Sequence, residues 1–330
     1  MKQNRHDSKI TQSDNWMRLT IMKKTALSLA IAAVIPAFAQ AEKVEIELPK
    51  FYGKVNVSVQ ATDEADTNIS EVVSNASRLG VKGKIDLNHG LEGVYKAEYE
   101  TQVDDGDKDG ETFAQRNIYA GIKGGFGQVI VGKFDTPLKK AQKKVDLFND
   151  LEGDIKSAIT ASDNRASNST QYSTPKLAGL TANVAHIASE DETVNDGTSA
   201  SVTYSRDKIY AAVAYDTDVE ADGVDVTRLV AQYSIAGIQL GGLWERQEVD
   251  GADDEQMGWV TSVAYKLTSD IKLKAQYGES DIVKNQAKTY SLGVDYKLAK
   301  GAKAYAFATD EEYGETDSNE YYGVGLEYKF

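Results

Sequence analysis

Cysteine is missing from the 330 residues of this chain, and histidine occurs only three times. Without cysteine, the chain has no disulfide framework, no thiol nucleophile and no cysteine-based metal site. The histidines, His6, His89 and His186, stand singly in the sequence, whereas a serine-type hydrolase needs a histidine beside its nucleophile. These absences argue against an enzyme, and we expect neither a cofactor nor a bound metal.

Basic charge is also scarce, with 37 Lys and Arg against 51 Asp and Glu and a formal net charge of −14. Because attraction to phosphate requires clustered Lys and Arg, nucleic acid is not an expected partner. Residues 105–110 begin like a calcium-binding loop, but Arg116 occupies the twelfth position, where that loop requires a bidentate Glu. Specific calcium binding by this segment is therefore not expected.

Only one long apolar run occurs, near the amino terminus. It extends from Ala26 to Ala39, follows a basic start and is followed by Ala41, which completes a small-x-small end. This order is typical of a cleaved secretory signal, and the run is shorter than the ~20 residues that a membrane-spanning helix needs. We predict an upstream extension at 1–21 that is not native, a signal peptide at 22–41 and one domain at 42–330.

Alternation of apolar and polar residues with a period of two is abundant instead. The apolar face of the last strand is formed by five residues, Tyr322, Val324, Leu326, Tyr328 and Phe330. The same alternation recurs at 51–60, 78–87, 91–100 and 290–298, and no apolar face carries a charge. Because a charge facing lipid at mid-bilayer costs roughly 2–4 kcal/mol, these faces suit lipid. A soluble β-sandwich, whose strands alternate in the same way, is the alternative.

Three further features favour a membrane barrel over a sandwich. Aromatic residues recur at the ends of apolar faces, the polar faces carry both signs of charge, and short turns alternate with long connections. The long polar connections are expected at 61–77, 103–111, 189–198, 217–225, 246–255, 279–287 and 310–318. We predict an all-β fold, a transmembrane antiparallel barrel of about sixteen strands, whose interior is wide enough for water.

Residues 136–169 form a connection that is too long for an ordinary turn, and loops of this length are usually functional or disordered. The pattern from Leu138 to Asp154 predicts a helix with lysines at 139, 140, 143 and 144. Its apolar residues, which would be buried, are Val145, Leu147, Phe148 and Leu151. A charged exterior lobe is one interpretation of this segment, and a loop folded inward is the other.

Several blocks resemble the general diffusion porins of Gram-negative bacterial outer membranes. The blocks are Ser77–Gly83, His89–Tyr99, Gln115–Gly121, Gly125–Gly132 and Asn168–Pro175. The resemblance covers the mature chain, including Phe51-Tyr-Gly-Lys54 at its start and Phe330 at its end. It implies a homotrimer of sixteen-stranded barrels, each with a long third loop folded into the pore. It also implies export to the outer membrane and passive diffusion of small hydrophilic solutes and ions.

The same resemblance implies three kinds of partner and a charged pore constriction. The partners are outer-membrane lipid, lipopolysaccharide and the barrel-assembly machinery, which would recognise the carboxyl-terminal strand. Matching positions give the basic wall as Lys54, Arg78, Arg116 and Arg165 and the acidic loop as Asp146, Asp150, Glu152 and Asp154. The loop departs from the family pattern, because it lacks the Pro-Glu-Phe-Gly-Gly segment and carries additional lysines.

Two points stay open in the sequence. Arg116 shares a strand face with Ile118, Ala120 and Ile122, so alternation alone also permits it to point outward. The acidic net charge favours a weak cation preference, which inward-facing lysines and Arg78 oppose. A substrate-selective channel and a structural or adhesive barrel without an open pore are the alternative functions.

Overall fold

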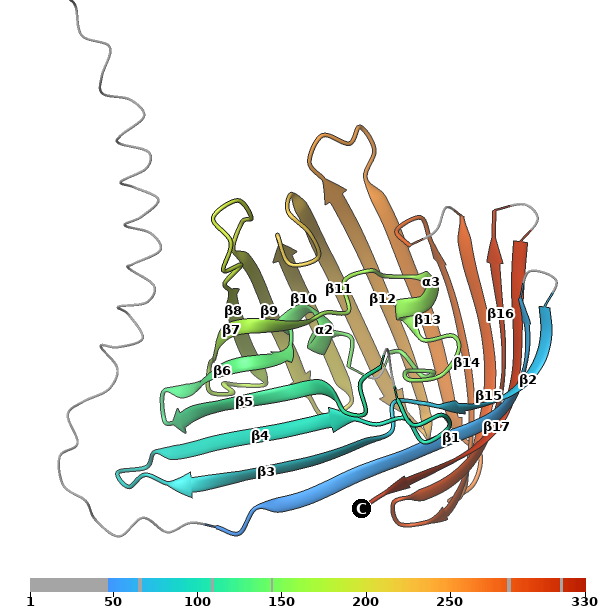
Figure 1. Cartoon of the computed structure of the whole chain (residues 1–330), viewed down its shortest axis with the longest axis horizontal. Coiled ribbons are helices and arrows are strands. Elements are labelled where there is room, and N and C mark those ends of the chain that lie inside the picture. Colours follow the sequence, from blue (N-terminus) through green and yellow to red (C-terminus); the bar gives the residue numbers. More distant parts are fainter. Residues whose placement is uncertain (1–46, 65–66, 108–109, 144, 284–285, 315–316) are drawn as a thin grey trace, which may run out of the picture. The chain divides into compact units, whose positions relative to one another are not determined.

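The computed structural model describes residues 47–330, apart from 65–66, 108–109, 144, 284–285 and 315–316. The predicted extension and signal peptide lie outside these residues. Strands dominate the described part of the chain (Figure 1). The segments are β1 (Lys50–Glu64), β2 (Thr67–Ser74), β3 (Arg78–Asp86), β4 (Glu92–Glu100), β5 (Ala114–Gly124), β6 (Gly127–Asp135), β7 (Arg165–Ser173), β8 (Leu180–Ile187), β9 (Gly197–Arg206), β10 (Ile209–Thr217), β11 (Val224–Ile235), β12 (Ile238–Val249), β13 (Gln256–Lys266), β14 (Ile271–Ser280), β15 (Ala287–Ala299), β16 (Ala302–Tyr313) and β17 (Asp317–Lys329).

The sheet closes into a barrel because its first and last strands pair with each other. Each strand is antiparallel to its neighbours, and β1 pairs with β17 in a register from Lys54 opposite Lys329 to Glu64 opposite Asn319. Among the described strands, closure therefore leaves no edge whose unpaired backbone groups lipid could not satisfy. The predicted transmembrane antiparallel barrel is confirmed.

The seventeen segments form sixteen barrel strands, because β2 and β3 share one position beside β1. The second half of β1 pairs with β2, and its first five residues pair with β3. The break lies at 75–77, where Ser77 Oγ accepts from Asn56 N at 3.0 Å and donates to Asn56 O at 3.1 Å. Residues 67–74, which the sequence placed in a connection, are therefore strand.

The two faces of the strands have opposite polarity, as the alternation predicted. Val324 of β17 and the terminal Phe330 are 61% and 67% exposed, and Leu326 and Tyr328 between them are exposed as well. On β1, the side chains of Asn56 and Gln60 are only 4% and 2% exposed. Polar residues thus lie inside the barrel and apolar residues outside, which is the arrangement that lipid requires.

The segment predicted as a helix from Leu138 to Asp154 is helical only at its start, in α2 (Pro137–Ala141). The next helix, α3 (Ile155–Ala158), begins after Asp154, which caps it. Among the described residues, no helix is long and apolar enough to cross a membrane. The prediction of one continuous helix is wrong, because Lys143, Asp150 and Gly153 have φ angles of 51°, 68° and 83°, outside the right-handed helical region.

Candidate functional site

The connection between β6 and β7, residues 136–164 and hereafter the third loop, is held by apolar packing. Leu138, Val145 and Ile155 are at most 1% exposed and belong to a cluster with buried side chains of β10–β13. Phe148, also fully buried, packs with Tyr305 and Phe307 of β16 and with Tyr321 of β17. Leu147 and Leu151 pack against this second cluster. Of the four apolar residues that the sequence expected to be buried, Val145 and Phe148 are fully buried and Leu147 and Leu151 are partly buried. Leu138 and Ile155 also seat the loop.

Backbone contacts fix the middle of the third loop to β14 and β16. The side-chain amide of Gln276 accepts from Leu147 N at 2.8 Å and donates to Gly153 O at 3.0 Å. Thr309 Oγ1 donates to Glu152 O at 3.1 Å. A Cβ atom at Gly153 would lie 2.2 Å from Ser291 Oγ, so the loop approaches the wall at a distance that only glycine permits.

A buried ionic cluster fastens the end of the third loop to β11 and β12. Arg228, 0% exposed, donates to Glu245 Oε2 at 2.6 Å and to Asp163 Oδ1 at 3.0 Å. It also donates to Thr160 Oγ1 at 2.9 Å and to Leu138 O at 3.3 Å. The guanidinium of Arg228 on β11 therefore contacts both ends of the third loop and the neighbouring strand β12.

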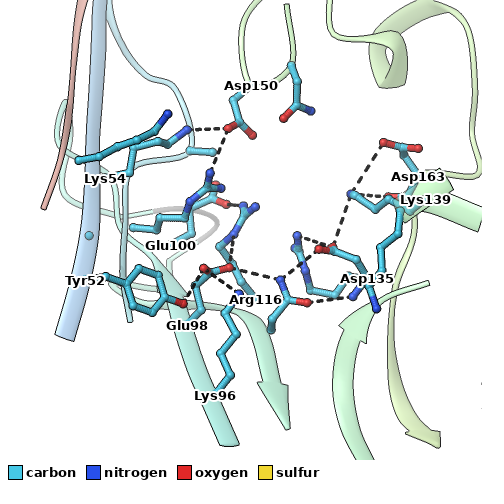
Figure 2. A pocket seen from close by; sticks show the side chains of 18 of the residues that line it. Tyr52, Lys54, Lys96, Glu98, Glu100, Arg116, Asp135, Lys139, Asp150 and Asp163 are labelled. Atoms are coloured by element: carbon cyan, nitrogen blue, oxygen red, sulfur yellow. Dashed lines mark hydrogen bonds and ion pairs between the residues drawn. The ribbon is translucent and has the colours of Figure 1, made fainter. Parts of the chain in front are cut away.

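Asp150 is the loop carboxylate that faces the predicted basic wall (Figure 2). Its Oδ2 lies 2.5 Å from Lys54 Nζ and 3.5 Å from Arg78 Nη2. Burial alone would raise the pKa of Asp150, but the charges of Lys54 and Arg78 and the hydrogen bond from Lys54 outweigh it and lower the pKa. Asp150 is thus held ionised between two cations from different strands.

Arg116 points toward the same side as these residues, and a strand irregularity explains why. It contacts Glu98 at 3.3 Å and also pairs with Glu100. The register of β4 and β5 shifts between Ala97 and Tyr99, which interrupts the alternation next to Arg116. Such a bulge re-aims side chains, so simple alternation could not decide the orientation of this arginine.

Arg165 is placed near the other basic residues by β7, but its partner is not on the third loop. Its Nη2 lies 2.8 Å from Asp135 Oδ1 on β6. Asp135 also accepts from Asn117 Nδ2 at 3.1 Å, which connects it to the group around Arg116 and Glu98 (Figure 2). The four predicted basic residues therefore line one region, with carboxylates interspersed.

Asp146 and Asp154 organise the third loop itself and form no ion pair with the predicted wall among the described residues. Asp146 accepts from Phe148 N at 3.0 Å, and burial followed by the charge of Asp154 raises its pKa. Asp154 caps α3 by accepting from Lys156 N at 3.0 Å and also accepts from Asp150 N at 2.9 Å. Their roles are those of local hydrogen-bond acceptors.

Glu152 lies among acidic residues and away from the basic wall. Its Oε1 accepts from Gln60 Nε2 at 3.3 Å, and Gln60 also donates to Glu71. Burial raises the pKa of Glu152, the hydrogen bond from Gln60 opposes that rise, and the charges of Glu311, Glu64 and Glu71 add to it. Glu152 therefore does not lie beside Lys54 and Arg78, where Asp150 lies.

Glu152→Gln is expected to stabilise the folded barrel at neutral pH by on the order of 1 kcal/mol, because it removes one charge from a set of like charges. A carboxyl whose folded pKa is raised destabilises the fold above that pKa and not below its unfolded value. The gain should therefore vanish as the pH falls below about 4. Urea titrations of the refolded barrel at both pH values test this, and an equal gain at both would contradict it.

A cavity of about 680 Å³ lies between the third loop and the wall formed by β1, β3, β4 and β5. Its basic lining residues are Lys54, Arg78, Lys82, Lys96, Arg116, Lys139, Lys140, Lys143, Lys156, Arg165 and Lys329. Its acidic lining residues are Glu98, Glu100, Asp135, Asp150, Asp154 and Asp163. Basic side chains outnumber acidic ones here, although the chain as a whole is acidic.

Several residues of this region were not among the sequence candidates. They are Tyr52, Glu98, Glu100, Asp135, Asp163, Arg228 and Glu245. Glu98 and Glu100 stand on the polar face of a predicted strand, which was a usable signal. Arg228 precedes the outward Leu229, so alternation turned it inward, but no sequence pattern joined it to Asp163, 65 residues away.

Comparison with known proteins agrees with this architecture. A family model described as Gram-negative porin matches residues 26–316. The chain belongs to this family. It is 24% identical over 352 residues to the major outer membrane protein P.IB of Neisseria meningitidis serogroup A, covering 94% of this chain and all of that protein.

Solved structures show the same fold. The anion-selective porin from Comamonas acidovorans superimposes with a TM-score of 0.72 at 22% identity, over 87% of this porin and all of that chain. The trimer form of OmpT from Vibrio cholerae gives 0.65 at 16% identity, over 88% of this porin and all of that chain. The predicted porin family, channel function and outer-membrane location are confirmed.

Proposed function

We propose that this porin is a passive channel narrowed by its third loop, with selectivity set by charges at the cavity described above. The observation that carries the proposal is Asp150 on the loop, positioned opposite Lys54 and Arg78 on the wall. This ion pair joins the loop directly to the wall and so narrows the passage beside it, and the basic and acidic side chains that line the cavity produce the field that orients water and dipolar solutes. Screening leaves this field in place close to the lining, because the Debye length is ~8 Å at physiological salt.

The proposed solutes are small and hydrophilic, and the proposed preference is for anions. The basic excess of the cavity supports this, and it opposes the weak cation preference that the total charge favours. The fold is shared with a porin named as anion-selective. The charge nearest to the narrowest passage should dominate, since exposed charges farther away than a Debye length are largely screened.

The expected result in a planar bilayer under a salt gradient is an anion-to-cation permeability ratio above one. Reversal potentials measured with KCl give this ratio directly. A ratio below one would contradict the anion preference. Failure to conduct at all would favour a closed structural barrel, and saturation of the current by one class of solute would favour a substrate-selective channel.

We also propose a homotrimer in the outer membrane, with lipid and lipopolysaccharide around it. The structure of a Vibrio cholerae porin in a trimer form supports the assembly, and the exposed apolar face of the barrel supports the lipid contacts. The aromatic and apolar face of β17, which ends at Phe330, is the proposed recognition signal for the barrel-assembly machinery. Passage through the channel involves no catalytic step.

A further inference from the structure

Exposed carboxylates gather at the end of the barrel that carries the long connections. They lie on the connections after β4, β8, β10, β12 and β14 and are Asp104, Asp105, Asp107, Glu111, Glu190, Asp191, Glu192, Glu220, Asp222, Asp250, Asp253, Asp254, Glu255 and Asp281. The sequence of these five connections contains only two basic residues, Lys108 and Lys284, so the connections are strongly acidic. In outer-membrane barrels this end faces the exterior.

Exposed cations gather at the opposite end, where the short turns are. The residues in or next to those turns are Lys82, Lys84, Lys123, Lys176, Arg206, Lys208, Lys266, Lys272, Lys297, Lys300 and Lys329. Fewer carboxylates accompany them. Asp86, Asp207 and Asp270 lie in or next to the turns, and Glu92, Asp295 and Glu327 pair with Lys84, Lys272 and Lys329. The short-turn mouth of the barrel is therefore mainly basic.

The same separation runs along single strands and across strand pairs. On β16 the charge changes from Lys303 near the short turn to Asp310 near the long connection, where Asp310 stands opposite Glu320 of β17. Lys54 stands opposite Lys329 at the other end of the β1–β17 pair. Like charges directly opposite each other are destabilising, so pairing within the sheet does not account for this arrangement.

We infer that the channel rectifies, passing more current when the exterior is positive than when it is negative. At that polarity cations enter through the acidic mouth and anions through the basic mouth, and each mouth concentrates the ion that enters it. At the opposite polarity both ions meet a mouth of their own sign, and the pore is depleted of carriers. This inference rests on the proposed passive channel and adds that its conductance depends on the sign of the applied voltage.

Single-channel current–voltage curves of the unmodified protein test the inference. At about 0.1 M salt, where the Debye length is about 10 Å, we expect currents at equal and opposite voltages to differ by about twofold. At about 1 M salt, where it is about 3 Å, the ratio should approach one. Because the chain has no cysteine, Ala252→Cys on the β12–β13 connection, captured with biotin-maleimide and streptavidin from one chamber, reports the orientation of each channel.

Matched variants separate charge from pore shape. Combining Asp250→Asn, Asp253→Asn, Asp254→Asn and Glu255→Gln should move the low-salt ratio toward one while leaving the current at high salt unchanged. The control Asp207→Asn with Asp270→Asn removes the same sign of charge from the other mouth and should leave the ratio equal or larger.

Three results would overturn the inference: symmetric currents at low salt, the opposite polarity, or asymmetry that persists at high salt. An equal fall of the ratio in the loop variant and in the control would do so as well. The absence of channel steps at every voltage would instead contradict the passive channel itself, which distinguishes the two failures.

Discussion

Arg228→Ala is expected to lower the free energy of unfolding by about 3–5 kcal/mol, because it leaves buried carboxylates without their cation. Arg228, Glu245 and Asp163 are at most 6% exposed, and the guanidinium also donates to Thr160 and to Leu138 O. Lys139 also joins the start of the third loop to its end, because its Nζ donates to Asp163 O at 2.8 Å. Arg228 differs in that it contacts both ends of the loop from the barrel wall. We therefore also expect a noisier and larger single-channel current once the loop ends are released.

Urea unfolding of the refolded barrel measures the first effect, and bilayer recordings measure the second. Arg228→Lys keeps the charge but not the planar fork that serves several acceptors, so an intermediate loss of stability is expected. Replacing Arg228, Glu245 and Asp163 together by apolar residues should cost less than Arg228→Ala alone, because no unpaired charge remains. A loss below about 1 kcal/mol for Arg228→Ala would contradict the anchoring role.

Neutralising Lys82, Lys140 and Lys143 together by glutamine is expected to reduce the anion-to-cation permeability ratio about tenfold. All three line the cavity, and none forms an ion pair with a carboxylate in the described part of the chain. A charge about 8 Å from the path of an ion acts oppositely on anions and cations, and after screening each lysine changes the ratio about twofold. Reversal potentials across a planar bilayer measure the change.

Two control variants test whether the charge of the cavity lysines causes the change in the permeability ratio. The corresponding Lys→Arg variant retains the charge and should retain the ratio. Lys176, Lys208 and Lys300 lie at the short turns and outside the residues that line the cavity, and their replacement by glutamine removes the same total charge. If this second variant reduces the ratio as strongly as the first, the cavity does not set the selectivity.

The barrel itself was predictable because its cause is local. Each strand must turn apolar residues toward lipid and polar residues toward water, and this requirement repeats every second residue. The alternation at 51–60 and along β17 therefore predicted both the class of fold and the outward faces. The alternation did not identify the strand at 67–74, because the exposed residues of β2 include polar ones. This strand pairs with the part of β1 nearest the long connections.

The constriction was predictable only in part. Lys54 and Arg78 were identified by resemblance and by alternation, and the structure brings both to Asp150. The orientation of Arg116 depends on the irregular register of β4 and β5, which the sequence does not show. The path of the loop backbone places Glu152 and Asp146 away from the basic wall. A carboxylate in a loop has no periodicity to fix its direction, so its partner depends on how the whole loop is seated.

The sequence by itself determined the strand faces and favoured a barrel with a polar interior over a sandwich, because its apolar faces suit lipid and lipid offers no partner to the backbone of an open sheet edge. Only the tertiary structure decided which charges meet inside. Arg228 and Asp163, or Lys54 and Asp150, are far apart along the chain. Their contact follows from barrel closure and from the apolar packing of the third loop, and both are properties of the assembled fold.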